Sequence, residues 1–407
     1  MQKHLIVIGG GAAGFFCAVN AARMNSNLKV TIIEKSNKLL SKVRVSGGGR
    51  CNVTHDCFEI GELIKRYPRG QNFLKKAFHW FSTKDTIEWF SERGVALKTE
   101  PDGRMFPVTN TSQTIVDCLM EEANQYGVDV KTSCEISNIA IEGGRFALTT
   151  ANSQQLTSDF ICIASGGYPK SLQFQWLQKL GHGIEEPVPS LFTFNMPNNP
   201  ITQLMGVSVE HAQVKIIGSK LNNSGPLLIT HWGMSGPAVL KLSAYGAREL
   251  AVKNYHFRIL VNWLTNFNEQ TLKEEWLILR QQYASNKIHN RNPFGLPNRL
   301  WAFLLNDCAI IEGARWADVT SKQQNQLIKN LTAQEFDVKG KTTFKEEFVT
   351  CGGIKLGEIE ANTMQSKIVP NMFFAGEVMD IDGVTGGFNF QNAWTSGFIA
   401  AKAITSL

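Results

Sequence analysis

The chain has 407 residues, 43% of them hydrophobic and 19% charged, with 41 lysines and arginines against 35 aspartates and glutamates. This balance excludes an intrinsically disordered protein, and the length predicts roughly two or three domains. A net charge of +6 suits a ligand that carries phosphate, but it is too dilute to indicate nucleic acid by itself.

The cysteines and the apolar runs indicate a cytoplasmic protein. No CxxC spacing occurs among the 8 cysteines, which excludes a zinc ribbon and a thioredoxin-type pair, and we expect no metal site. Several cysteines lie in apolar runs such as residues 160–163, as is typical of free thiols in a reducing compartment. The start of the chain shows no signal peptide, and no apolar run approaches the roughly 20 residues of a membrane span, so we expect no membrane partner.

The first third of the chain predicts alternating strands and helices. Residues 4–8 predict a buried strand, followed by a glycine-rich turn, a helix to about Met24 and a second strand at 30–33. Further along, the sequence predicts helices at 82–94 and 111–126 and short strands at 128–130, 136–141, 146–149 and 160–164. The last of these is fully apolar, which predicts a parallel strand that returns to the first sheet.

The pattern changes after Pro189. Residues 191–263 predict antiparallel strands, and residues 267–332 predict helices. The sequence then predicts strands at 336–338, 344–349 and 372–375 and a closing helix at 390–403. We therefore expect a nucleotide-binding α/β domain (1–190 and 345–407) interrupted by an inserted antiparallel β domain (191–263 and 333–344) and a small helical domain (264–332).

The clearest motif is a dinucleotide fingerprint, Gly9-x-Gly11-x-x-Gly14. The first glycine permits the tight turn, the second lets a pyrophosphate approach the backbone, and the third lets the helix pack closely on the strand. Glu34 follows 20 residues after Gly14, at the end of the second strand, where a carboxylate accepts hydrogen bonds from ribose hydroxyls. Together these features predict a Rossmann-like unit that binds a dinucleotide.

Three more glycine clusters favour FAD over NAD as that dinucleotide. They are residues 46–50, 165–167 and 383–387, and each adjoins a predicted strand, so each can bring backbone close to a long ligand. We also expect Asn389 to cap the closing helix. The N-terminus of that helix, aimed at the N1–C2 edge of an isoalloxazine, would stabilise the negative charge of reduced flavin.

These motifs resemble the aminoacetone-oxidase-like family of FAD-binding bacterial flavoproteins, often labelled NAD(P)/FAD-dependent oxidoreductases, which includes bile-acid-reducing members. The resemblance spans nearly the whole chain, and the block Ser-Gly-Gly-Gly-Arg-Cys-Asn at 46–52 is its most specific part. The segments that carry it are residues 9–14, 34–35, 46–54, 102–107, 230–237, 349–353, 363–367 and 374–391.

The resemblance implies a glutathione-reductase-type FAD domain and assigns its contacts. Residues 46–52 would line the flavin, 376–377 would contact the pyrophosphate–ribitol region, 387–389 would meet the flavin ring, and Ile136 would offer backbone groups to adenine. The residues expected to bind the cofactor are Gly9, Gly11, Ala12, Ala13, Gly14, Glu34, Lys35, Lys42, Ser46, Gly47, Gly48, Gly49, Arg50, Cys51, Asn52, Ile136, Ala164, Ser165, Gly166, Gly376, Glu377, Gly383, Gly386, Gly387, Phe388 and Asn389.

Leu40 departs from the family, which usually has a glycine there, so we expect a differently shaped loop after Glu34 and a weaker role for Lys42. Cys51 and Cys57 lie where disulfide reductases of this fold carry a redox pair, but their spacing of six is one too long. A packed, unreactive Cys51 is therefore favoured over a redox dithiol.

Two residues are candidates for acid–base catalysis. His231, beside Trp232 in a glycine-flanked loop, suits proton transfer near a substrate, although bonding to the loop backbone fits it equally well. Asp380 belongs to an acidic loop with Glu377 and Asp382 and would bind an amine or accept its proton. The alternative is that these carboxylates cap turns and bind ribitol hydroxyls, which is favoured for Glu377.

The sequence thus predicts an FAD-dependent oxidoreductase that transfers a hydride between flavin N5 and a small organic substrate. Oxygen and NAD(P)H both remain open as electron partner, and with a single fingerprint NAD(P)H would dock only transiently. A flavin-dependent tRNA-modifying or RNA-binding protein is the alternative, with the basic and aromatic stretch 65–80 as its footprint. A third hypothesis is a sensor that binds flavin without turnover. A solvated helix face is the favoured interpretation of that stretch, so nucleic acid is not the expected partner, and the sequence does not indicate an oligomeric state.

Overall fold

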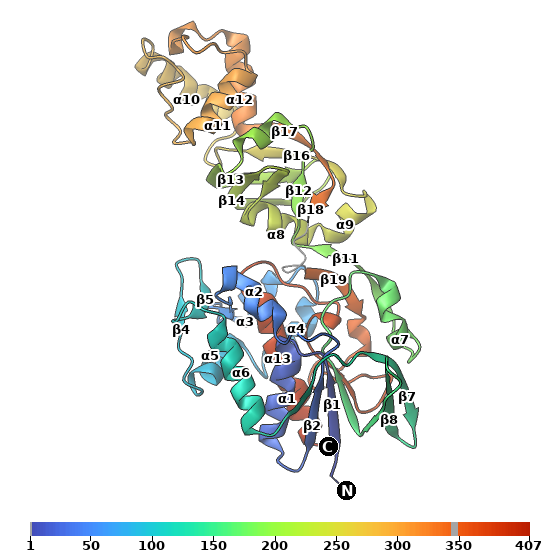
Figure 1. Ribbon diagram of the computed structural model, residues 1–407. Helices are drawn as coiled ribbons and strands as arrows, with labels where there is room; N and C mark the ends of the chain where they lie inside the picture. Colours follow the sequence, from blue (N-terminus) through green and yellow to red (C-terminus); the bar gives the residue numbers. More distant parts are fainter. Residues whose placement is uncertain (1, 343–348) are drawn as a thin grey trace. The chain divides into compact units, whose positions relative to one another are not determined.

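The computed structural model describes residues 2–342 and 349–407, which fall into two compact units (Figure 1). Unit 1 comprises Met1–Ser190 and Phe344–Leu407, and unit 2 comprises Leu191–Thr343. Residues 344–348 of the strand predicted at 344–349 lie outside the described residues.

A parallel sheet forms the centre of unit 1. Its order is β20-β10-β1-β2-β6, and all neighbouring strands run in the same direction. The strands are β1 (His4–Ile8), β2 (Lys29–Ile33), β6 (Asp129–Lys131), β10 (Phe160–Ile163) and β20 (Met372–Phe374). Leu5 to Val7 and Ile161 to Ile163 are fully buried, as the unbroken apolar runs predict for a sheet covered on both faces. This arrangement confirms the Rossmann-type α/β fold.

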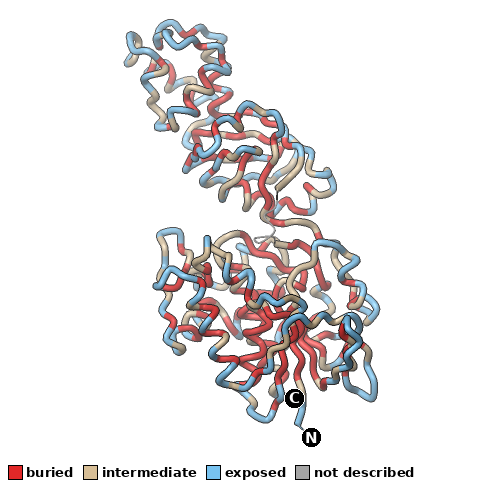
Figure 2. Tube along the Cα trace, viewed as in Figure 1, coloured by how far each residue is buried: buried red, intermediate tan, exposed pale blue. Residues whose placement is uncertain are grey.

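Three helices pack together beside this sheet: α1 (Ala12–Met24), α6 (Gln113–Gln125) and α13 (Phe388–Thr405) (Figure 1). The contact between α1 and α13 is close because small residues face each other. A Cβ added to Gly397 would lie 2.8 Å from the Ala13 carbonyl oxygen. Figure 2 shows the resulting core of unit 1 as a continuous buried region around the strands.

The remaining elements of unit 1 are short. A sheet of order β3-β5-β4 combines Thr54–His55, Arg104–Pro107 and Leu97–Thr99. The other strands are β7 (Ile136–Glu142), β8 (Arg145–Thr150) and β9 (Gln155–Ser158), which form a meander, and β11 (Ile184–Ser190), which pairs with β19 (Val349–Ile354). The other helices are α2 (Ser41–Gly49), α3 (Ile60–Leu63), α4 (Gln71–Ala77), α5 (Thr83–Ser91) and α7 (Gln175–Gln178). The helix α5 begins as predicted, with Ser82 and Asp85 forming a capping box.

Unit 2 contains an antiparallel sheet of order β17-β16-β13-β14-β15-β12-β18. The strands are β12 (Thr193–Asn195), β13 (Ser208–Ile216), β14 (Asn222–Thr230), β15 (Gly233–Ser235), β16 (His256–Asn262), β17 (Gln334–Lys339) and β18 (Lys341–Thr342). The prediction of strands throughout 191–263 is wrong in one part, because α8 (Pro237–Tyr245) and α9 (Ala247–Val252) interrupt them. Pro237 at the first helical position starts α8, and the apolar side chains that follow it bury against the sheet.

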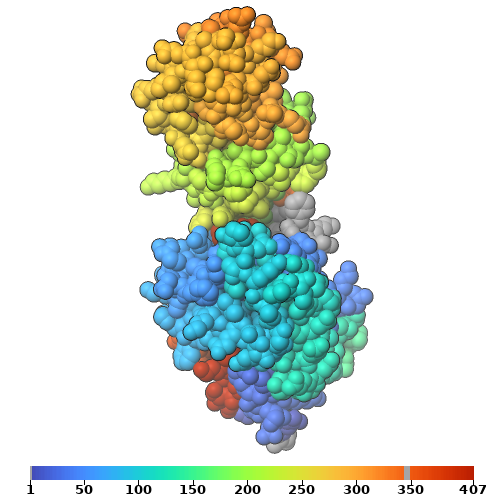
Figure 3. All heavy atoms as spheres, turned by 90° about the vertical axis from the view of Figure 1, so that its left-hand side faces the viewer, coloured from blue at the N-terminus to red at the C-terminus, as the bar shows by residue number. Residues whose placement is uncertain are grey.

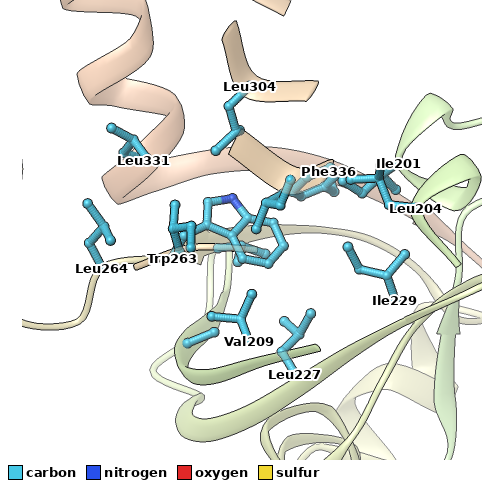
Figure 4. Packing of buried hydrophobic residues seen from close by; sticks show 14 of the residues in the cluster. Ile201, Leu204, Val209, Leu227, Ile229, Trp263, Leu264, Leu304, Leu331 and Phe336 are labelled. Atoms are coloured by element: carbon cyan, nitrogen blue, oxygen red, sulfur yellow. The ribbon is translucent and has the colours of Figure 1, made fainter. Parts of the chain in front are cut away.

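The helices α10 (Glu269–Gln282), α11 (Asn298–Asp307) and α12 (Ser321–Ala333) also belong to unit 2. They share one hydrophobic core with the sheet. Figure 4 shows Trp263 within this core, among Leu264, Leu304, Leu331 and Phe336. Across residues 2–342 and 349–407, we find no helix with both the length and the apolar character of a membrane span.

Candidate functional site

Four of the predicted segments meet at one edge of the parallel sheet. Residues 9–14 follow β1, residues 34–35 follow β2, residues 164–166 follow β10, and residues 376–377 follow β20. Because these strands are parallel and adjacent, the segments after them emerge at the same edge. This is where ligands bind in open α/β sheets.

The three glycines of the fingerprint have different surroundings. A Cβ on Gly9 would lie 2.3 Å from the Ala164 carbonyl oxygen, and one on Gly14 would lie 1.9 Å from the Gly9 carbonyl oxygen. In contrast, no described atom comes within 4 Å of the position of a Cβ on Gly11. Gly11 precedes α1, and none of the described side chains caps that helix. The space and the uncapped N–H groups fit a pyrophosphate, which such a helix end binds.

Glu34 is fixed beside this turn. One carboxylate oxygen accepts the Gly10 N–H at 2.9 Å, and the other accepts the Ser36 N–H and hydroxyl, both at 2.9 Å. The oxygen that accepts the Gly10 N–H can accept one more hydrogen bond, so Glu34 can also receive a ribose hydroxyl. Ile136 belongs to the same neighbourhood, because the Cys134 N–H donates to the Glu34 carbonyl at 2.9 Å. Lys35 is exposed, with its ammonium 5.8 Å from the centre of the Tyr168 ring.

Lys42 and Glu377 form an ion pair between two of the predicted cofactor segments. The Lys42 ammonium lies 2.5 Å from one oxygen of Glu377, and the other oxygen accepts the Thr350 N–H at 2.8 Å. In the loop that leads to Lys42, Leu40 stands where the resemblance predicts a glycine, and it has left-handed backbone with φ of 55°. Glycine adopts this conformation freely, whereas for another residue it costs about 1–2 kcal/mol. The buried Leu40 side chain offsets this cost.

The glycine cluster at 46–50 breaks the helix α2. Gly47, Gly48 and Gly49 all have positive φ, and no described atom lies within 4 Å of a Cβ on either Gly48 or Gly49. Arg50 is held by Glu100 at 2.5 Å and stacks on Phe106 with its guanidinium 4.0 Å from the ring centre. The cluster therefore leaves an open strip of backbone that suits a flat ligand.

Cys51 is fully buried, and this burial raises the pKa of its thiol to about 12. A thiol that stays protonated is a poor nucleophile, so the packed interpretation of Cys51 is favoured over a redox dithiol. Cys57 is partly exposed, and burial raises its pKa as well.

The start of α13 adjoins the Ser46–Asn52 segment. The Asn52 side chain accepts the Gly387 N–H at 2.9 Å, and a Cβ on Gly387 would lie 2.6 Å from the Thr54 carbonyl oxygen. The prediction that Asn389 caps α13 is wrong. Gly387 is the residue before the helix, and the Asn389 side chain bonds the N–H and the carbonyl of Gly383 at 2.8 and 2.9 Å. Asn389 is already inside the first turn, so it fixes the preceding loop instead and leaves the N–H groups of the helix uncapped.

His55 and Tyr67 were not among the predicted site residues, although both contact Phe388. The His55 imidazole stacks on the Phe388 ring at 4.8 Å, and the buried Tyr67 hydroxyl donates to the Phe388 carbonyl at 2.7 Å. Burial lowers the pKa of His55, whose Nε2 faces the Asp102 carbonyl at 3.1 Å. The position of His55 directly after the 46–54 block was the available signal for it.

Asp380 and Asp382 of the acidic loop have different surroundings. Asp382 is fully buried and forms an ion pair with Arg69, and the Ser190 hydroxyl donates to it at 2.6 Å. Burial raises the pKa of Asp382, while Arg69 opposes that shift. Asp380 is buried close by, and its N–H donates to the Ile354 carbonyl at 3.1 Å. Asp382 is thus a structural carboxylate.

His231 belongs to unit 2, whereas all the predicted cofactor residues belong to unit 1. It is exposed in the tight turn between β14 and β15, with its ring 3.9 Å from that of Trp232. Among residues 2–342 and 349–407, no group of His, Cys, Asp and Glu side chains is arranged to hold a metal ion.

Similar proteins of known sequence cover almost the whole chain. Two of them are ribosomal RNA dihydrouridine synthases, from Escherichia coli and Haemophilus influenzae, each 29% identical over 98% of this chain. They are covered over 96% and 98% of their own lengths. A 3-dehydro-bile acid delta(4,6)-reductase from Clostridium scindens is 24% identical over 99% of both chains.

Solved structures with the same fold include a 3-ketosteroid delta1-dehydrogenase from Sterolibacterium denitrificans, with a TM-score of 0.54, 12% identity and 99% of each chain covered. A quinol fumarate reductase from E. coli has a TM-score of 0.52 and 15% identity over 100% of this chain and 70% of that chain. The narrower aminoacetone-oxidase-like assignment stays a prediction. The model of the HI0933-like protein Rossmann domain matches residues 3–403, so the chain belongs to that family.

Proposed function

We propose that this chain is an FAD-dependent oxidoreductase that saturates a carbon–carbon double bond conjugated to a carbonyl group. The observation that supports FAD as the cofactor is the difference in surroundings among the three glycines of the fingerprint. Backbone atoms close off Gly9 and Gly14, whereas Gly11 faces open space at an uncapped helix end. That combination supports a dinucleotide pyrophosphate at Gly11.

The chain's own groups would divide the work of holding the cofactor. The first N–H groups of α1 would bind the pyrophosphate, and Glu34 would accept a ribose hydroxyl. The open backbone at Gly48 and Gly49 would hold the flat ring system, and the uncapped start of α13 would stabilise negative charge on it. When bound, FAD supplies a ring that accepts and donates a hydride at N5.

The names of the relatives support the type of reaction. Conversion of uridine to dihydrouridine saturates the C5–C6 bond, which is conjugated to a ring carbonyl, and a delta(4,6)-reductase of a 3-dehydro bile acid likewise saturates bonds conjugated to a ketone. We propose uridine in ribosomal RNA as the substrate, because the two relatives of higher identity act there. A small enone is the second candidate, in keeping with the small organic substrate expected from the sequence.

Saturation adds a hydride to one carbon of the double bond and a proton to the other, so the enzyme needs an electron donor and an acid. The reductive direction favours NAD(P)H over oxygen as the electron partner. His231 and Asp380 are the proposed acids. The eight thiols, all free, support a reducing compartment such as the cytoplasm.

The test follows flavin colour and RNA mass in one preparation. Purified protein is loaded with FAD, reduced anaerobically with NADPH or NADH, and mixed with unmodified ribosomal RNA or with a steroidal enone. We expect reoxidation by the RNA and a uridine that has gained two hydrogens, detected by mass spectrometry of the nucleosides. Protein that does not bind FAD would overturn the cofactor assignment. Reduced flavin that neither substrate reoxidises would overturn the proposed reaction.

A pair of glycine variants tests the proposed pyrophosphate site at Gly11. Gly11→Ala meets no described atom, so we expect a folded protein whose FAD affinity falls about tenfold or more. Gly61→Ala is the matched control, since its Cβ also meets open space, and it should retain wild-type affinity. Equal affinity in the two variants would contradict pyrophosphate binding at Gly11.

A further inference from the structure

We propose that one face of unit 2 binds the phosphate backbone of the RNA substrate. This inference rests on the proposed function and adds the surface that recognises the RNA. The face, which we term the cationic face, comprises Arg280, Lys287, Arg291 and Arg315 with the ring of Tyr283. Arg280 lies in the last turn of α10, and the other members lie in the segment between α10 and α12, which is drawn in orange in Figures 1 and 3.

The first observation is the distribution of charge between the units. Unit 1 has 25 lysines and arginines and 25 aspartates and glutamates, so its net charge is zero. Unit 2 has 16 lysines and arginines and 10 aspartates and glutamates. Its 153 residues therefore carry the entire net charge of +6. Within it, residues 276–306 contain no aspartate or glutamate at all. A polyanion would therefore be attracted to unit 2 rather than to unit 1.

The second observation is that two loops bring the cations together. The Ile288 N–H donates to the Ala314 carbonyl, and the Trp316 N–H donates to the Asn286 carbonyl, both at 3.0 Å. Lys287 and Arg315 are partners in an antiparallel bridge, and both are exposed. Cations that are distant in the sequence therefore share one surface.

An aromatic ring extends this surface. The guanidinium of the exposed Arg291 lies 4.6 Å from the centre of the Tyr283 ring, and Tyr283 in turn packs 6.0 Å from Trp316. Arg280 donates to the Ala317 carbonyl at 2.7 Å, which fixes the cation beside the second loop. A half-buried ring beside arginines suits a nucleic acid, since bases stack on aromatic side chains while the cations contact phosphates.

The cations of this face are not neutralised by carboxylates. Within the part of the chain that the structure describes, none of the four forms an ion pair. Two acidic residues lie close in the sequence. Asp318 accepts the backbone N–H of Arg315 at 2.9 Å, and Glu312 is exposed.

The stretch expected from the sequence to contact RNA in the alternative function fits less well. Lys65 forms an ion pair with Glu62 at 2.6 Å, and Arg69 is taken up by the buried Asp382. Of that stretch, Arg66 and, on α4, Lys75 and Lys76 remain as exposed cations, within a unit of zero net charge.

The test replaces three cations in each unit. The variant Lys287→Gln, Arg291→Gln, Arg315→Gln removes charge from the cationic face, and the matched control Lys75→Gln, Lys76→Gln, Lys84→Gln removes the same charge from exposed positions of unit 1. Binding to ribosomal RNA is measured over a series of salt concentrations, and flavin reduction by NADPH is measured in parallel. For the first variant we expect about tenfold weaker binding or more and a salt dependence reduced by about 2 to 3 counterions. Flavin reduction should be unchanged in both.

The outcomes separate the two proposals. If wild-type protein neither binds nor reduces the RNA, the proposed substrate and the cationic face both fail. If it does both and the unit 2 variant matches it, only the cationic face is wrong, and a loss confined to the control would move the RNA site to α4 and α5. Arg291→Lys sharpens the result, because it keeps the charge and should retain the salt dependence while losing the stacking on Tyr283.

Discussion

The candidate binding sites of the two units are built from different parts of the chain. In unit 1 the candidate site is made mainly of backbone: Gly11, Gly48 and Gly49 leave space, and helix ends without side-chain caps leave N–H groups. In unit 2 the candidate surface is made of long exposed side chains that carry net positive charge. Backbone fixed by buried strands suits a cofactor of one defined shape, whereas flexible cations suit a large polyanion. The comparison predicts that changes in each unit affect different measurements.

The largest expected effect tests whether the units fold separately. Trp263 is buried in the core of unit 2, and its indole N–H donates to the Gln334 side chain at 2.8 Å. Trp263→Ala should destabilise unit 2 by about 3–5 kcal/mol, because it leaves a cavity and an unpaired buried amide. Unit 1 should keep its flavin. Because a chain of two units need not unfold in one step, flavin absorbance and tryptophan fluorescence must be followed separately.

Trp263→Phe is the control, since it keeps most of the ring and loses the hydrogen bond, with an expected cost of about 1–3 kcal/mol. Loss of the flavin in parallel with unit 2 unfolding would contradict independent units.

The second prediction concerns the buried ion pair of unit 1. Asp382→Asn leaves the Arg69 guanidinium, itself only 11% exposed, without its charge partner. We expect a loss of about 3–5 kcal/mol in the unfolding free energy of unit 1 and an unchanged midpoint for unit 2. The double variant Arg69→Met, Asp382→Leu removes both charges and should recover most of the loss. If the double variant is no more stable than the single one, Arg69 contributes through packing and not through the pair.

The third prediction returns to the fingerprint. Gly14→Ala puts a methyl group 1.9 Å from the Gly9 carbonyl oxygen, and backbone atoms cannot move aside as a side chain can. We expect a cost of about 3 kcal/mol together with loss of FAD, measured by denaturant unfolding and by absorbance after gel filtration. RNA binding by unit 2 should persist. A stable, yellow Gly14→Ala protein would show that α1 can shift away from β1.

The elements that the sequence predicted best are those with a local cause. The apolar runs at 4–8 and 160–163 are strands because burial on both faces requires such runs, and Ser82 marks the start of α5 because its side chain caps that helix. The four loops at the sheet edge follow from the parallel order of their strands. Their approach to one another was therefore predictable before any contact was known.

The rest depends on contacts between distant residues. Nothing near Asp382 in the sequence indicates that it pairs with Arg69, and the Lys287–Arg315 bridge joins residues 28 positions apart. The helices α8 and α9 were missed because they are short and lie between strands. His55 was missed because its stacking on Phe388 is a property of the fold, and its position directly after the 46–54 block was the one signal in the sequence.

The smallest effect concerns Cys51 and the choice between a packed thiol and a redox dithiol. Its folded pKa of about 12 lies above the ordinary value of 9.0, so above pH 9 the unfolded state releases this proton while the folded state keeps it. Stability is therefore full below pH 9 and falls as the pH rises, by about 1 kcal/mol between pH 8.5 and 10 for this one group. In denaturant titrations, the unfolding free energy of Cys51→Ala should therefore fall by about 1 kcal/mol less than that of the wild type between pH 8.5 and 10.

Thiol labelling tests the same choice directly. In the native protein at pH 8, Cys57 should react with a thiol reagent and Cys51 should not, and rapid labelling of Cys51 would restore the dithiol alternative.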